Sequence, residues 1–111
     1  MGRSEGLAPD RNARNVTRTI RFEAGAEREL DEIVRWYEER RAGLGSAFAE
    51  AIDDILAIVA ETPLAFVAVE GSDPALGLRR ATMARFPYLV VYTVSASEVW
   101  VVAIAHQRRE R

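Results

Sequence analysis

The chain has 111 residues, of which 49% are hydrophobic, and a formal net charge of −2. These values are typical of a single globular domain and leave little room for a large cofactor. Cysteine is absent and His106 is the only histidine, which excludes disulfide frameworks, thiolate chemistry and zinc sites built from Cys and His. No apolar run approaches the roughly 20 residues that span a bilayer, so we expect a cytoplasmic protein without a membrane anchor.

Charge is distributed unevenly along the chain. Residues 1–22 contain five Arg and two acidic residues, residues 23–62 four Arg and eleven acidic residues, and residues 63–111 six Arg and four acidic residues. This predicts one acidic and one basic layer, of which only the basic layer suits an anionic partner. All fifteen basic residues are Arg. Recognition of phosphate or carboxylate by guanidinium groups would explain this bias, but we prefer the simpler explanation of a GC-rich genome.

The first residues predict a tail followed by a strand. Residues 1–15 are rich in Gly, Arg, Asn and Asp without an apolar period, which is typical of a flexible segment. A single domain is expected over residues 16–111. Val16, Ile20 and Phe22 alternate with Thr and Arg residues, which predicts a half-buried strand.

Two amphipathic helices are predicted next. Apolar residues recur at helical spacing from Ala26 to Tyr37, and this helix is expected to end near Arg41 with Gly43 as its left-handed stop. The same spacing predicts a second helix over residues 44–61, with Ser46 as a candidate N-cap and Phe48 on its apolar face. The short connection between them requires an antiparallel hairpin.

The remainder of the chain is rich in β-branched and aromatic residues. Strands are predicted over residues 65–69, 78–83, 88–94 and 99–105, separated by short segments that contain Gly, Pro or Ser. Connections of this length indicate antiparallel pairing. The continuous apolar run over residues 89–94 is expected in the centre of the sheet. The fold class is therefore α+β.

The inventory of motifs disfavours most enzyme classes. No G-x-G-x-x-G or G-K-S/T sequence is present, so no nucleotide cofactor is expected. Asp53 and Asp54 are adjacent on a helix, where their side chains diverge, and we interpret them as a solvated face rather than a metal site.

A group of Arg and aromatic residues remains in the basic last third of the chain. Its members are Arg79, Arg80, Arg85, Tyr88, Tyr92, His106, Arg108 and Arg109. Arg80 and Tyr88 are residue types that hold a phosphate and stack on a base, and His106 exchanges a proton near neutral pH. The alternative is structural: both tyrosines are core residues with satisfied hydroxyls, His106 caps a strand end, and the arginines pair with acidic residues.

Trp36 and Tyr37 are adjacent on the first helix, so one of the two rings points away from its apolar stripe. The ring either widens the packed stripe or, if Trp36 lies at the rim of the hairpin, anchors a partner chain.

A series of short motifs runs through residues 17–110. The helical half contains WYEER at residues 36–40, GLG at residues 43–45, Phe48, Ala51, Ile58 and Pro63, and the second half contains LRR at residues 78–80, RFPY at residues 85–88, Val91, Tyr92 and VAIAHQRR at residues 102–109. In this order and spacing, the motifs resemble the RelE/ParE toxin superfamily of bacterial toxin–antitoxin modules. The resemblance implies a β-α-α-β-β-β fold in which a helical hairpin packs on a twisted antiparallel sheet.

The resemblance also implies a partner and a target. The partner would be a small ParD-like antitoxin whose flexible segment folds on binding, in a toxin–antitoxin hetero-oligomer, with Trp36, Arg40, Arg80 and Tyr92 as its expected contacts. The superfamily includes ParE-like inhibitors of DNA gyrase and RelE-like endoribonucleases that cut mRNA in the ribosome. A ribonuclease would use Arg80, Tyr88 and His106 here.

The chain resembles the ParE-like branch more closely. Lysine is absent, so the active-site lysines of the RelE type have no counterpart, and an acidic protein is a poor ribosome binder. The expected function is therefore non-catalytic inhibition of gyrase, without cofactor or metal. The expected target-binding residues are Arg79, Arg80, Arg85, Tyr88, His106, Arg108 and Arg109. A ribonuclease, or a subunit that only binds its antitoxin, stays as the alternative.

Overall fold

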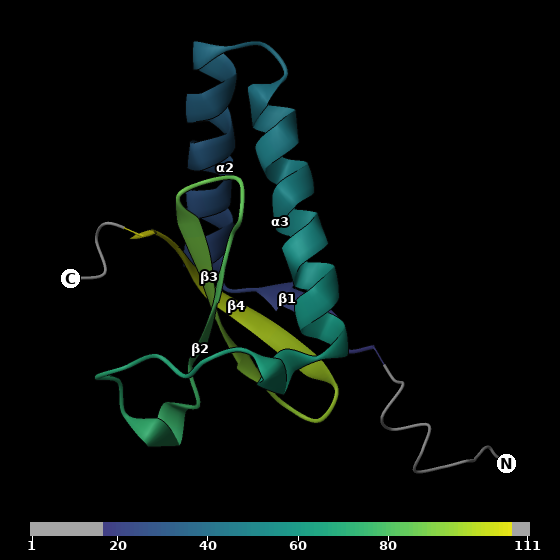
Figure 1. The fold of residues 1–111 in the computed structure, drawn as a ribbon, viewed down its shortest axis with the longest axis vertical. Coiled ribbons are helices and arrows are strands. Elements are labelled where there is room, and N and C mark those ends of the chain that lie inside the picture. Colours follow the sequence, from purple (N-terminus) through teal and green to yellow (C-terminus); the bar gives the residue numbers. More distant parts are fainter. Residues whose placement is uncertain (1–16, 108–111) are drawn as a thin grey trace, which may run out of the picture.

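The computed structural model describes residues 17–107 of the chain. In chain order its elements are β1 (Thr19–Phe22), α2 (Ala24–Arg40), α3 (Leu44–Glu61), the short 3-10 helices η2 (Pro63–Ala65) and η3 (Pro74–Leu76), β2 (Arg79–Thr82), β3 (Tyr88–Val94) and β4 (Glu98–His106). Two helices pack on a four-stranded sheet, which confirms the α+β class and the predicted element order (Figure 1). The predicted tail over residues 1–15 lies outside the described residues. No helix within residues 17–107 is long and apolar enough to cross a bilayer.

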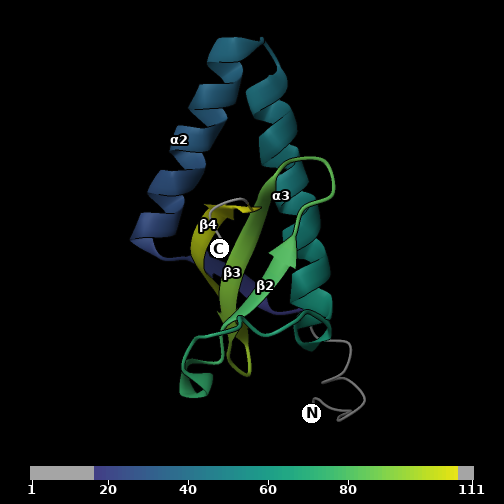
Figure 2. The same ribbon diagram turned by 60° about the vertical axis from the view of Figure 1, so that its left-hand side comes forward.

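The two helices form the predicted hairpin. Figure 2 shows α2 and α3 meeting at their short connection and diverging toward the sheet. Gly43, between them, has a φ of 90°, the left-handed conformation predicted at this position. Gly45 lies where the helices approach most closely, because a Cβ atom there would be 2.5 Å from the backbone oxygen of Val34. Glycine is therefore required at this crossing.

The start of α3 is capped by a side chain of α2. The predicted cap by Ser46 is wrong, because α3 already begins at Leu44 with Gly43 as its N-cap residue. Instead, the Glu38 carboxylate accepts hydrogen bonds from the backbone N–H groups of Gly43 and Gly45, each 2.9 Å long. These bonds favour the charged form and lower the pKa of Glu38. Glu38 thus fastens the end of α2 to the start of α3.

The strands lie in the order β1-β4-β3-β2. β3 is antiparallel to both of its neighbours and occupies the sheet interior, as predicted for the run over residues 89–94. β1, by contrast, runs parallel to β4. The sheet is therefore mixed, which corrects the expectation of antiparallel pairing throughout. Parallel pairing is possible because the helical hairpin and two further strands connect β1 to β4, a connection long enough for a crossover.

A β-bulge interrupts β4. Val102 has no partner on β3, because its neighbours Val101 and Ala103 pair with consecutive residues of that strand. Val101 and Ile104 consequently both pack in the core beneath the helices, although residues three apart in a regular strand point to opposite faces. The extra residue reverses the direction of every later side chain of β4.

The predicted strand over residues 65–69 does not form. Its first residue belongs to η2, and the segment that follows meets the sheet through one isolated bridge between Ala68 and Arg79. Val67 is exposed, so the segment lacks the burial that stabilises a strand of this composition. It shields part of the β2 edge without extending the sheet.

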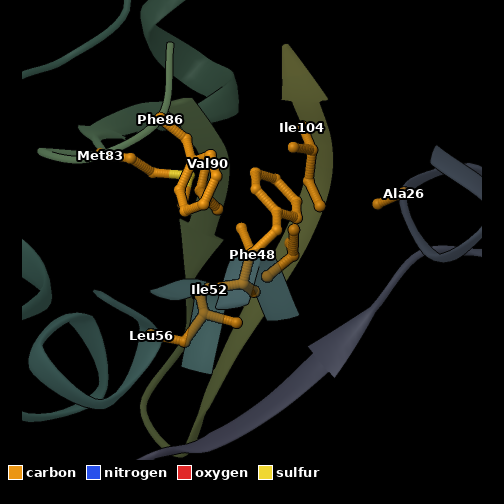
Figure 3. Packing of buried hydrophobic residues seen from close by; sticks show 9 residues of the cluster. Ala26, Phe48, Ile52, Leu56, Met83, Phe86, Val90 and Ile104 are labelled. Atoms are coloured by element: carbon orange, nitrogen blue, oxygen red, sulfur yellow. The ribbon is translucent and has the colours of Figure 1, made fainter. Parts of the chain in front are cut away.

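The main core lies between the hairpin and the sheet (Figure 3). At its centre Phe48 is 0% exposed, and its ring centroid is 5.0 Å from that of Phe86, 5.4 Å from that of Tyr37 and 5.5 Å from that of Tyr88. This confirms the predicted apolar face of the second helix. The cluster joins both helices, the β2–β3 turn and the start of β3, and so fixes the side chains near the end of the sheet.

Candidate functional site

The predicted Arg and aromatic residues are divided between the two faces of the sheet. On β2, Ala81 is fully buried and packs with Val59 of α3. Since side chains alternate along a strand, Arg80 points to the other face, away from the helices. We call this second surface the open face. It includes Arg21, Arg80, Val91, Trp100 and Ala103.

Two polar features lie on the open face among the described residues: a hydrogen-bonded cluster around Glu98 and the guanidinium group of Arg80. The Glu98 carboxylate accepts hydrogen bonds from Arg21 Nε at 2.6 Å and from Trp100 Nε1 at 2.9 Å, and both bonds lower the pKa of Glu98. The Arg80 guanidinium, by contrast, has no hydrogen bond or ion pair within residues 17–107. The Arg80 residue is half-buried on this face.

Arg79 and Arg85 lie in different surroundings from Arg80. Arg79 is half-buried, and its Nη1 donates a 2.6 Å hydrogen bond to the backbone oxygen of Phe66, which ties the loop after η2 to the sheet. Arg85 is exposed in the β2–β3 turn, where its guanidinium carbon lies 5.2 Å from the ring centroid of Phe86. It borders a hollow of about 230 Å³ against α3, beside Ile58, which is 53% exposed.

Tyr88 and His106 lie together on the helix-covered face. The two residues pair across β3 and β4, and their ring centroids are 5.0 Å apart with the planes at 72°. The bulge at Val102 causes this placement, since a regular strand would put His106 on the same face as Trp100. The structure therefore brings Tyr88 and His106 together and separates both from Arg80.

A groove of about 680 Å³ opens beside this pair, between α2 and the ends of β3 and β4. It is lined by Glu29, Glu32, Ile33, Trp36, Tyr37, Pro87, Tyr88, Ile104 and His106. We call it the α2 groove. Glu29 connects α2 to β4 at this groove, because Glu29 Oε1 accepts a 2.9 Å hydrogen bond from the backbone N–H of Ile104. Burial and the neighbouring Tyr88 raise the pKa of Tyr37.

Trp36 lies at the rim of this groove and is 49% exposed, which corresponds to the second of the two alternatives given for this ring. The Arg40 guanidinium carbon stacks 3.7 Å from its ring centroid, and Arg40 Nη1 donates a 3.1 Å hydrogen bond to the backbone oxygen of Trp36. Such an exposed cation–π contact contributes about 0.5–1 kcal/mol. The two predicted antitoxin contacts on α2 are thus adjacent and accessible.

The expected surface role of Tyr92 is wrong. Tyr92 is 0% exposed, and its hydroxyl donates a 2.6 Å hydrogen bond to the backbone oxygen of Pro63. Burial raises the pKa of Tyr92 to about 12, although the nearby Arg79 opposes this shift. Tyr92 is the core residue with a satisfied hydroxyl that the alternative explanation described. Arg108 and Arg109, also predicted at the site, lie outside the described residues.

Glu29 and Glu32, on the acidic side of the α2 groove, were not among the predicted site residues. Glu29, Glu32 and Trp36 are spaced i, i+3 and i+7, which places them along one flank of the apolar stripe of α2. This spacing predicts from the sequence that the three side chains lie together on α2. It does not predict which strand ends lie opposite them. Asp53 and Asp54 are both exposed, as the prediction of a solvated face required.

Known proteins share both the sequence pattern and the fold. Residues 20–111 match the family described as ParE toxin of type II toxin-antitoxin system, parDE. No curated protein matches the chain significantly. The chain is similar to a solved structure described as the chromosomal ParDE TA system from P. aeruginosa, with a TM-score of 0.67 and 16% identity, over 81% of this chain and 96% of that chain. That likeness shows a common fold, and the family match extends over most of the sequence. The chain belongs to the ParE toxin family of type II toxin–antitoxin systems.

Proposed function

We propose that this toxin is a non-catalytic inhibitor of DNA gyrase and that a cognate antitoxin neutralises it. The observation that supports inhibition over RNA cleavage is the division of the candidate catalytic residues. Acid–base cleavage requires its groups within hydrogen-bond reach of one substrate. Arg80 points to the open face, whereas Tyr88 and His106 lie 5.0 Å apart on the helix-covered face. Arg80 thus lies on the opposite side of the sheet from Tyr88 and His106, which disfavours contact of all three residues with one scissile phosphate.

The immediate surroundings of His106 also disfavour a phosphate. Glu29 and Glu32 line the same groove, and among residues 17–107 no Arg lines it. Two carboxylates repel an anion, and the repulsion is strongest where water is partly excluded. The groove therefore suits a binding contact better than phosphodiester chemistry.

The proposed target contacts are Arg80 on the open face and Arg85 in the β2–β3 turn. Arg80 has no partner within residues 17–107, and Arg85 is exposed beside the hollow at Ile58. Guanidinium groups that are not engaged internally are suited to bidentate contacts with carboxylates on another protein. Arg79 is a weaker candidate, because its guanidinium already holds the loop at Phe66.

The proposed antitoxin contacts are Trp36 and Arg40 on α2, together with Arg80. Trp36 is a large aromatic ring at the rim of a groove, and such rings are the residues that most often anchor protein interfaces. A segment that crosses from α2 to the open face would contact all three residues and would compete with a target that uses Arg80.

Gyrase supercoiling measured with and without the antitoxin tests this proposal. Purified toxin should block the supercoiling of relaxed plasmid, and the antitoxin encoded beside the toxin should restore it. If the toxin binds its antitoxin but never affects gyrase, the chain is an inactive subunit or acts on another target.

A further inference from the structure

The α2 groove combines an aromatic wall with two acidic residues. Its rings form a connected series: Trp36 and Tyr37 are 5.2 Å apart, Tyr37 and Tyr88 6.5 Å, and Tyr88 and His106 5.0 Å, each pair edge to face. The series runs from α2 to the neighbouring ends of β3 and β4. The π-faces of aromatic rings attract cations, and several rings around one site increase that attraction.

The carboxylates of Glu29 and Glu32 lie on the same groove, one helical turn apart. Neither is in an ion pair within residues 17–107. Glu29 Oε1 accepts a hydrogen bond from the backbone N–H of Ile104, which holds this carboxylate at the groove, and its second oxygen has no hydrogen bond within residues 17–107. Among the described residues that line the groove, Glu29 and Glu32 are the acidic ones, and none is Arg.

The chain itself already uses part of this wall to bind a guanidinium group. Arg40 stacks 3.7 Å from the Trp36 ring centroid and covers one face of the indole. Half of the Trp36 surface is still exposed, at the rim of the groove. The ring also lines the groove, where the carboxylates of Glu29 and Glu32 supply a counter-charge for a second cation.

From this arrangement we infer that the α2 groove binds an arginine side chain of a protein partner. The planar guanidinium stacks on the aromatic wall and pairs with Glu29 and Glu32, which an ammonium group of lysine does less well because it is not planar. An acidic or phosphorylated segment is disfavoured by the two carboxylates. The inference rests on the part of the proposed function that assigns Trp36 to a partner, and it does not depend on which enzyme the toxin inhibits.

A peptide titration followed by NMR tests this inference. The probes are Ac-Gly-Arg-Gly-NH2 and the uncharged Ac-Gly-Gln-Gly-NH2, added to the ¹⁵N-labelled full chain at low salt. The chain has two tryptophans, so two indole N–H signals report on the two faces of the sheet. The arginine peptide should shift the Trp36 signal saturably and leave that of Trp100, which is bonded to Glu98 on the open face, unchanged. The glutamine peptide should shift neither.

Two variants supply the controls. Glu29→Gln combined with Glu32→Gln should weaken arginine binding by about fivefold, as the loss of two exposed charge pairs predicts. Glutamine keeps the oxygen that accepts the Ile104 hydrogen bond, so the fold is retained, and the unperturbed Trp100 signal verifies this. Glu27→Gln removes the same charge from the other flank of α2 and should leave binding unchanged.

Equal shifts with both peptides, or undiminished binding to the double Gln variant, would overturn the inference. The supercoiling assay distinguishes this outcome from failure of the proposed function. A toxin that inhibits gyrase but does not bind the arginine peptide contradicts the inference alone. A toxin that binds the peptide through Trp36 but does not affect gyrase contradicts the proposed target alone.

Discussion

The ring of His106 packs edge to face against the ring of Tyr88, with 5.0 Å between their centroids, on the face of the sheet that the helices cover. The unpaired Val102 is responsible, because it reverses the side-chain direction of the last residues of β4. As a result, His106 lines the α2 groove together with Glu29 and Glu32 instead of sharing the open face with Arg80.

Phe48→Ala should lower the free energy of unfolding by about 3–5 kcal/mol, because the removed ring is fully buried among three other aromatic rings and leaves a cavity. Chemical denaturation measures this value. Ile58→Ala, at an exposed position of the same helix, is the control and should change stability by about 0.5 kcal/mol or less. Similar effects of the two substitutions would show that the core has been placed on the wrong face of α3.

Gly45→Ala should destabilise the protein by about 1–3 kcal/mol despite the better helix propensity of alanine. The new methyl group would be 2.5 Å from the Val34 oxygen and 2.9 Å from Glu38, so the helices must separate or shift. Thermal unfolding tests this, with the exposed Ser46→Ala as the neighbouring control. A stabilised Gly45→Ala variant would contradict the close approach of α2 and α3.

Stability should depend on pH through Glu38. Its pKa in the folded protein is below the ordinary value of 4.5, so its contribution is complete above that value and is lost as the pH falls through the lower, folded pKa. The stability difference between the wild type and Glu38→Gln should therefore shrink on acidification from neutral pH to about pH 3. Urea midpoints at the two pH values measure it, with the exposed Glu50→Gln as control. If the stability difference between the wild type and Glu38→Gln does not change with pH, the capping role of Glu38 is contradicted.

Replacing Arg80 and Arg85 with Ala should abolish growth arrest and leave the fold intact, because neither side chain is in an ion pair within residues 17–107. Arg80 lies on the open face and Arg85 in the β2–β3 turn, so the single variants show which surface contacts the target. Arg35→Ala, which removes a charge from the exposed side of α2, should stay toxic. Full toxicity of the double variant would exclude these arginines as target contacts.

The helical hairpin could be predicted from the sequence because its signals are local. The apolar spacing from Ala26 to Tyr37 and from Leu44 to Val59, together with Gly43 as the left-handed residue, determines two helices and a reversal regardless of the rest of the chain. The strand predicted over residues 65–69 was wrong for the opposite reason, because strand formation depends on the rest of the fold. Their composition fits a strand, but only the tertiary structure decides whether a sheet edge is available to pair with them.

The grouping of the site residues could not be predicted, because a single unpaired residue decides it. Period-two alternation from Val99 onward places His106 on the face of Arg80, and nothing in the run VVAIA at residues 101–105 reveals that Val102 is extra. The burial of Tyr92 could not be predicted either, because it also depends on a contact distant in the sequence. Its hydroxyl partner, the backbone oxygen of Pro63, is 29 positions away in the sequence. For Trp36 and Tyr37, helix geometry predicts only that one of the two rings points away from the apolar stripe, and the structure shows that Trp36 is the more exposed one.

One parallel titration tests the central claim most directly: increasing toxin is added to a gyrase supercoiling reaction and to a translation extract in which the integrity of the mRNA is followed. A non-catalytic inhibitor should block supercoiling in proportion to the toxin bound to gyrase, and the mRNA should stay intact at the same toxin concentrations. Codon-specific cuts in the mRNA, with supercoiling unaffected, would contradict the account and return Tyr88 and His106 to a catalytic role.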